Sequence, residues 1–168
     1  PVYAGAVILN KNINTKLLKD SKLLSKQNRE KLNIYIKKNS SWSIGKASVK
    51  EIEKFNILNA SLLAMKRAIK KLSRKPNIVI IDGNKIPEIK NYNLKSIIKA
   101  DQKIPSVSAA SIIAKVSRDK FIRKLSKKFK NYGWETNCGY GTKKHLLALK
   151  KFGATNHHRK TFAPIHKI

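Results

Sequence analysis

Short β-branched apolar runs alternate with long amphipathic segments along this chain, and that alternation restricts its fold more than any other feature. Val2–Leu9 and Ile78–Ile81 read as buried strands, and Ser41–Ala47 and Ser96–Lys99 as two further strands. Helical patterns fill the stretches between them. We therefore expect an α/β fold with a mostly covered sheet, in one domain over residues 1–168.

Capping residues mark the expected helices. Ser25 is placed to cap a helix that ends near Asn39, and Thr142 to cap a last helix stopped by Gly153. Ser48-Val49-Lys50-Glu51 matches a capping box, which predicts a short helix from that point.

Two longer amphipathic helices are predicted, at 56–72 and at about 106–129. Their spacing predicts the residues that face the core. These are Leu58, Leu62, Met65 and Ile69 in the first helix, and Ala110, Ala114, Phe121 and Leu125 in the second.

The charge balance points to a polyanionic partner. Lys and Arg number 38 against nine Asp and Glu, which gives a net charge of +29. Nucleic acid is the first candidate and an anionic membrane surface the second. A compositional explanation stays open, because 32 of the 38 basic residues are Lys, as an AT-rich genome would encode.

Other function classes are disfavoured. The single cysteine, Cys138, excludes an intrachain disulfide framework and a cysteine-based zinc finger. The apolar runs are too short to span a bilayer, and no secretory signal is visible, so we expect a cytoplasmic protein without a membrane partner. The adjacent His157 and His158 have diverging side chains, which disfavours zinc.

Two aspartates are the candidate chemical centre. Asp82 ends an apolar strand before a Gly-Asn turn, and Asp101 is expected at the end of the next strand. Strand-end carboxylates in one cleft can hold Mg²⁺ together with substrate phosphates. Hydrogen bonds within turns explain the same residues, so both interpretations stay open. Asp119 is assigned to an ion pair with Arg123, four residues on.

Several polar and basic side chains are candidates for binding a phosphate backbone. They are Ser21, Lys22, Ser111, Lys115 and Arg118. Tyr140 lies between two glycines and could stack on a base or a sugar, although filling a loop cluster is the simpler role.

Taken together, the motifs resemble those of a known family, bacterial ribonuclease HII. The resemblance runs through the whole chain in order. Its motifs here are Leu18-Lys19-Asp20-Ser21-Lys22-Leu23-Leu24-Ser25, Asn56-Ile57-Leu58-Asn59-Ala60-Ser61-Leu62-Leu63-Ala64-Met65, Ile81-Asp82-Gly83-Asn84, Lys99-Ala100-Asp101, Ser-Ala-Ala-Ser-Ile-Ile-Ala-Lys-Val-Ser-Arg-Asp at 108–119, Gly139-Tyr140-Gly141-Thr142 and His158-Arg159-Lys160-Thr161-Phe162-Ala163-Pro164.

The resemblance implies a ribonuclease H-like fold, with a mixed sheet flanked by helices, and a monomeric endoribonuclease. Its substrates would be RNA/DNA hybrids and duplex DNA carrying single ribonucleotides, cut to leave a 3′-hydroxyl and a 5′-phosphate. Mn²⁺ or Mg²⁺ would be the cofactor in a two-metal reaction. Asp82 and Asp101 match two of four family metal ligands, and Tyr140 matches the tyrosine that contacts the sugar beside the scissile phosphate.

The chain also departs from the family pattern. Asn137-Cys138 stands where the family usually has His-Lys. The family's Asp-Glu…Gly-Arg-Gly segment, which forms the central strand and supplies the other two carboxylates, is not found in the 168 residues. The resemblance thus implies an N-terminally truncated chain that is inactive and unstable by itself. The alternative function is a non-catalytic, basic nucleic-acid-binding module.

Overall fold

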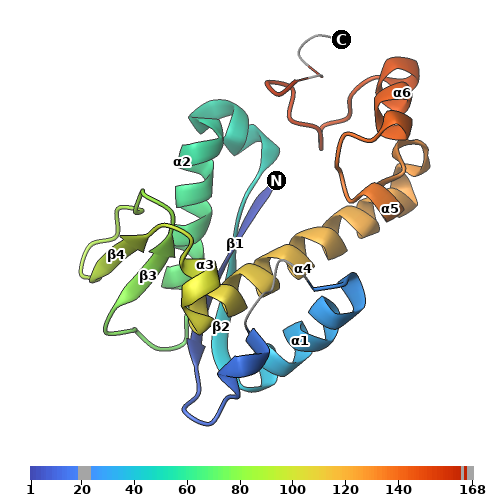
Figure 1. Ribbon diagram of the computed structural model, residues 1–168. Coiled ribbons are helices and arrows are strands. Elements are labelled where there is room, and N and C mark those ends of the chain that lie inside the picture. The colour runs from blue at the N-terminus through green and yellow to red at the C-terminus, as the bar shows by residue number, and fades with distance from the viewer. Residues whose placement is uncertain (19–23, 164, 166–168) are drawn as a thin grey trace.

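A computed structural model describes residues 1–18, 24–163 and 165 (Figure 1). Strands and helices alternate along the chain, as the sequence predicts. The larger elements are β1 (Val2–Leu9), α1 (Lys26–Lys38), β2 (Ser40–Ala47), α2 (Val49–Lys70), β3 (Val79–Asp82), β4 (Leu94–Ile97), α4 (Pro105–Lys128) and α6 (Lys143–Phe152). The shorter helices are η1 (Thr15–Leu18), α3 (Ala100–Lys103), η2 (Lys130–Tyr132) and α5 (Trp134–Asn137).

The strands β1 and β2 form an antiparallel ladder that lies between two layers of helices. In its register Ala4 faces Gly45 and Gly5 faces Ile44, so these two pairs point to opposite faces of the ladder. On one face Gly45 lies against the α2 backbone, and on the other Gly5 lies against the α4 backbone at Ala110. The two long helices therefore cross the ladder at its glycines, which have no side chain to hold the helices away.

The strands β3 and β4 form a separate two-stranded parallel sheet, in which Val79 faces Leu94 and Asp82 faces Ile97. The position of β4 corrects the expectation of a strand at 96–99. Lys99 has a left-handed backbone and ends the extended segment, and Asp101 lies in the first turn of α3. The four strands thus form two sheets, not one mostly covered sheet.

The capping box at the start of α2 is confirmed. The Ser48 hydroxyl accepts a hydrogen bond from the Glu51 amide, and the Glu51 carboxylate accepts one from the Ser48 amide. A hydrogen bond from Arg67, followed by those from Ser48, lowers the pKa of Glu51 to about 2. At Asn56 the backbone turns to φ 65°, which divides α2 into the short and the long helix that the sequence predicts.

The predicted core face of α2 is wrong at its first position. Leu58 is 49% exposed, whereas the fully buried residues Ala60, Ala64 and Ala68 face the ladder. The cause is the close approach at Gly45, which admits methyl side chains and excludes larger ones. Ile69 is buried as expected.

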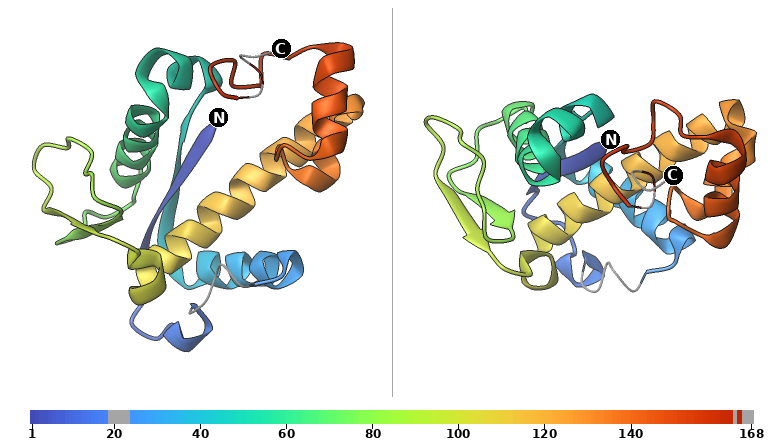
Figure 2. Two further views of the ribbon diagram at one scale, coloured as in Figure 1. Left: turned by 45° about the horizontal axis from the view of Figure 1, so that its top comes forward. Right: turned by 90° about the horizontal axis from the view of Figure 1, so that it is seen from above.

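The helix α4 runs through the middle of the molecule, and α1 packs beside it (Figures 1 and 2). Its core residues include Ala109, Ile112, Ile113 and Val116, which pack with Ile36 of α1. The predicted inner positions Ala110 and Ala114 are only half-buried and line a cleft described below.

The last part of the chain packs on the far end of α4. Phe121 and Leu125 of α4 pack against a buried cluster that includes Tyr132, Trp134 and Leu149, as their place on the predicted inner face requires. Thr142 caps α6 through its hydroxyl, and Gly153 ends the helix. Among the described residues no helix is long and apolar enough to cross a membrane.

Replacing Gly45 with alanine is expected to destabilise the fold by about 3 kcal/mol, because the new methyl group would overlap the Ala64 carbonyl and the Ala68 amide. Urea unfolding of the two proteins measures the difference. Gly141→Ala is the matched control, since its added methyl group lies 4.0 Å from the nearest side chain. The packing account fails if both substitutions change the free energy of unfolding equally.

Candidate active site

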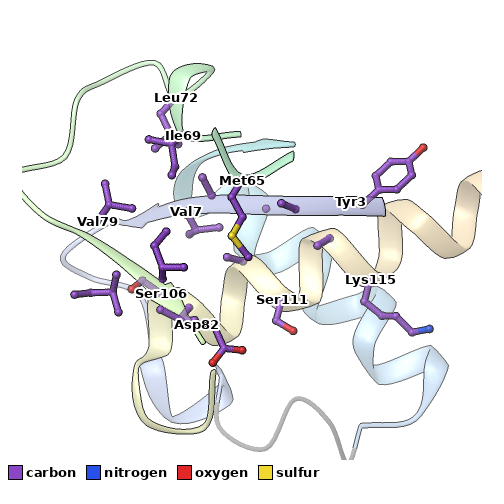
Figure 3. Close-up of a pocket in the computed structure, with 18 of the residues that line it drawn as sticks. Tyr3, Val7, Met65, Ile69, Leu72, Val79, Asp82, Ser106, Ser111 and Lys115 are labelled. Carbon is purple, nitrogen blue, oxygen red and sulfur yellow. The ribbon is translucent and has the colours of Figure 1, made fainter. Parts of the chain in front are cut away.

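A single cleft collects four of the eight candidate site residues, Asp82, Ser111, Lys115 and Arg118. It has a volume of about 720 Å³ and is lined by β1, β3, α2 and α4. In the view of Figure 3, Ile69 and Leu72 lie above β1, the Met65 side chain crosses it, and Asp82, Ser111 and Lys115 lie below it. An apolar cavity thus carries a polar and charged rim.

Asp82 stands at the end of β3, on the rim of the cleft, as the sequence predicts. Its side chain is exposed, and its Oδ1 accepts a hydrogen bond from the Ala100 amide at 2.9 Å. Asp101 follows Ala100 directly but is 5% exposed. The hydrogen bond therefore places the Asp82 carboxylate against the main chain just before Asp101, which lies in a helix and not at a strand end.

One face of α4 presents the candidate phosphate contacts. Ser111, Lys115 and Arg118 are spaced four and three residues apart, which aligns them along the helix, and all three line the cleft. Ser21 and Lys22 lie outside the described residues.

Tyr140 lies beside this face of α4, in the loop after α5. Its hydroxyl is 3.2 Å from Lys115 Nζ, and its ring lies 5.0 Å from Lys115 Nζ and 5.4 Å from the Arg118 guanidinium. Arg118 also donates a hydrogen bond to the Cys138 carbonyl, in the turn that carries Tyr140. The ring is nevertheless 60% exposed, so its position is set while its surface stays accessible.

Asp119 is an ion-pair residue, but its partner was predicted wrongly. Its carboxylate lies 3.1 Å from Lys115 Nζ and 3.2 Å from Arg118, and so holds the two cations that contact Tyr140. Arg123 instead pairs with Glu30 at 2.7 Å and joins α4 to α1. A helical spacing of four residues cannot distinguish these partners, because a residue from another helix competes for the guanidinium.

Arg159 is a site residue that the sequence reasoning did not select, although it lies in a quoted motif. It lines the cleft and donates a hydrogen bond to the Pro1 carbonyl at 3.3 Å. Burial and, after it, Arg118 lower the pKa of Arg159. The two guanidinium groups make this end of the cleft electropositive.

The segment that carries Arg159 is held in place by a buried histidine pair. His145 and His158 stack at 5.3 Å, and both are about 95% buried. The Thr155 amide donates to His158 Nδ1, so the neutral ring carries its proton on Nε2, which has no hydrogen-bond partner among the described residues. Burial and, after it, His145 lower the pKa of His158 to about 4.

The site has limited capacity for a metal ion by itself. Within the described part of the chain, no group of three or more His, Cys, Asp or Glu side chains is placed to hold one. Two neighbouring carboxylates fit a hard divalent cation whose remaining ligands are water and substrate phosphate. The Asp82 carboxylate is joined to the residue before Asp101 through the Ala100 amide, and Asp82 but not Asp101 is among the residues that line the cleft.

Solved structures define the class of protein to which this fold belongs. Ribonuclease H2 from Pyrococcus horikoshii OT3 matches with a TM-score of 0.75 and 25% identity, over 99% of this chain and 96% of that one. A ribonuclease HII from Archaeoglobus fulgidus, solved in a complex with PCNA, matches with a TM-score of 0.72 and 25% identity, over 95% and 86% of the two chains. The fold is that of the type 2 ribonucleases H.

The sequence places the chain within that class. The family model described as Ribonuclease HII matches residues 1–166. The Ribonuclease HII of Pelagibacter ubique (strain HTCC1062) is 72% identical over 168 residues, which are all of this chain and 90% of the relative. This chain belongs to the ribonuclease HII family, as its motifs predict, and is a divalent-metal-dependent endoribonuclease of the ribonuclease H type.

Lowering the pH from about 6.5 to 4 is expected to destabilise the protein through His158. The unfolded chain takes up a proton near pH 6.5, while the buried ring resists protonation until about pH 4, so falling pH favours unfolding throughout this window. Urea unfolding at several pH values should show a loss on the order of 2 kcal/mol from this group.

His158→Gln is expected to make the free energy of unfolding depend less on pH between 6.5 and 4, whatever the effect of the substitution on stability at neutral pH. Equal slopes for the two proteins between pH 6.5 and 4 would show that His158 does not titrate as the buried pair requires.

Proposed function

We propose that this enzyme hydrolyses the RNA strand of RNA/DNA hybrids and cuts duplex DNA at single embedded ribonucleotides, leaving a 3′-hydroxyl and a 5′-phosphate. The observation that carries the proposal is the meeting of Asp82, the Ser111–Lys115–Arg118 face of α4 and Tyr140 beside one cleft. We further propose that it acts as a cytoplasmic monomer, since one chain carries all of these groups.

Asp82 and Asp101 are the proposed metal ligands. A divalent cation there would activate the attacking water and stabilise the leaving oxygen. Asp82 is held for this role by the Ala100 amide, which donates a hydrogen bond to one of its oxygens, and Asp82 lines the cleft. The chain has 38 basic and nine acidic residues, so two aspartates linked through the Ala100 amide stand out from their surroundings.

The α4 face is the proposed phosphate-binding surface. Lys115 and Arg118 carry the charge, and Ser111 supplies a hydroxyl for a hydrogen bond to a phosphate oxygen. Asp119 holds both cations from the same helix, which fixes their direction before substrate arrives. Ser21 and Lys22 remain proposed contributors to the same surface.

Tyr140 is the proposed sensor of the ribonucleotide. A 2′-hydroxyl is the group that distinguishes a ribonucleotide from its DNA neighbours, and a ring packed on the sugar can detect it. The two cations under Tyr140 set the position of the ring, while its exposed face is free to receive the sugar.

Asp82→Asn is expected to lower cleavage at least a thousandfold while duplex binding is retained, because the amide removes a ligand charge but keeps the shape of the side chain. Cleavage of a DNA duplex with one ribonucleotide, in Mg²⁺ or Mn²⁺, measures the first effect, and fluorescence anisotropy the second. The assay is run on the 168-residue chain and on a form preceded by an Asp-Glu…Gly-Arg-Gly segment, and the more active form is the reference.

Glu88→Gln is the matched control, since Glu88 is an exposed carboxylate outside the cleft that lies just beyond β3. Full turnover in the Asp82→Asn protein would remove Asp82 from the metal site. Binding without cleavage in every form would favour the non-catalytic nucleic-acid-binding module.

Tyr140→Ala is expected to reduce cleavage at a single embedded ribonucleotide at least tenfold. Tyr140→Phe should have a smaller effect, because it loses the 3.2 Å contact with Lys115 but keeps the ring over both cations. Initial rates on the single-ribonucleotide duplex and on a long hybrid give the comparison. Equal rates for the wild type and Tyr140→Ala on the first substrate would exclude the proposed role.

A further inference from the structure

The turn that carries Tyr140 is held by hydrogen bonds to the residue three positions before it. Asn137 Oδ1 accepts a hydrogen bond from the Gly139 amide at 2.7 Å, and the Asn137 carbonyl accepts one from the Tyr140 amide at 3.0 Å. Between them Cys138 has a left-handed backbone with φ 48°. A residue other than glycine keeps that conformation only where its surroundings enforce it, and the two hydrogen bonds to Asn137 span Cys138.

The other end of the Asn137 amide is anchored in the core. Its Nδ2 donates a hydrogen bond to the Tyr132 carbonyl at 2.8 Å. Tyr132 is buried, and its ring stacks on Trp134 at 5.2 Å. The same carbonyl lies 3.0 Å from His145 Nδ1, which donates to it because a carbonyl only accepts. The Asn137 side chain therefore joins a rigid buried segment to an exposed turn.

This anchor differs from the other contacts of Tyr140 in its independence from the substrate. Lys115 and Arg118 contact the ring, but they are also the cations proposed to bind phosphate. A phosphate that engages these cations weakens their hold on the ring. Neither Asn137 nor its partners Tyr132 and Gly139 line the cleft, so a phosphate bound there does not compete for their hydrogen bonds.

We propose that Asn137 is the residue that positions Tyr140 for the ribonucleotide. Its side-chain amide fixes the turn against the Tyr132 main chain while Lys115 and Arg118 engage the substrate. Asn137 acts through Tyr140 and does not itself contact the substrate, so the inference rests on the proposed role of Tyr140. Both ends of the amide are required, the acceptor for Gly139 and the donor for Tyr132.

Two substitutions test the amide. Asn137→Ala removes both side-chain hydrogen bonds, and Asn137→Asp keeps the shape and the acceptor but turns a second oxygen toward the Tyr132 carbonyl. The measured quantity is the cleavage rate at a single embedded ribonucleotide divided by the rate on a long hybrid, in the reference form of the enzyme. A loss of folded protein lowers both rates equally and leaves this ratio unchanged.

The ratio is expected to fall at least fivefold in both Asn137 variants. Asn131→Ala is the matched control, since Asn131 is an exposed asparagine in the same segment, and should leave the ratio unchanged. A wild-type ratio in Asn137→Ala would overturn the inference. A wild-type ratio in Asn137→Asp alone would overturn the required anchor at Tyr132.

A double variant shows whether Asn137 acts through Tyr140. In a protein that already carries Tyr140→Ala, Asn137→Ala is expected to change the ratio less than twofold, because no tyrosine is left to position. Independent, multiplicative effects of the two substitutions would show that Asn137 acts elsewhere and would overturn the inference.

Hydrogen exchange of the Gly139 amide, followed by NMR, tests the turn without the nuclease reaction. Asn137→Ala is expected to speed this exchange at least fivefold, and Asn131→Ala less than twofold. Unchanged exchange in Asn137→Ala would overturn the inference even if Tyr140 proves essential for cleavage. Faster exchange combined with full activity of Tyr140→Ala would instead overturn the proposed role of Tyr140, and with it the function assigned to Asn137.

Discussion

The close approach of two helices to the β1–β2 ladder determines the rest of the structure. Gly45 lets α2 contact one face, and Gly5 lets α4 contact the other. With α4 held at backbone contact, its rotation about its own axis is fixed. Ile112, Ile113 and Val116 then face the core, and Ser111, Lys115 and Arg118 face the cleft. The candidate phosphate surface is therefore a consequence of packing at a residue without a side chain.

Local signals in the sequence predicted local structure well. The bounds of β1 match the apolar run at 2–9, and the caps at Ser25, Ser48 and Thr142 start the helices that were expected. These features depend on residues within four positions of one another, so no tertiary information is needed to predict them. The position of Asp82 was predicted in the same local way, because an apolar run followed by Asp-Gly-Asn already places a carboxylate at a strand end.

Predictions that depend on contacts between distant segments were less successful. Leu58 fits the helical stripe of α2, yet the buried face is set by Gly45 of another strand. Arg123 pairs with Glu30, 93 residues away, and leaves Asp119 to Lys115 and Arg118. Asp101 reaches the site from a helix turn because Lys99 adopts a left-handed backbone, which no propensity of lysine predicts.

The cleft connects the two sides of this molecule, the apolar interior and the basic surface. Lys115, Arg118 and Arg159 stand where the apolar walls end, and Asp119 already engages the first two. Cations at the edge of a low-dielectric wall are poorly hydrated, so a phosphate or a carboxylate gains more there than at an open lysine.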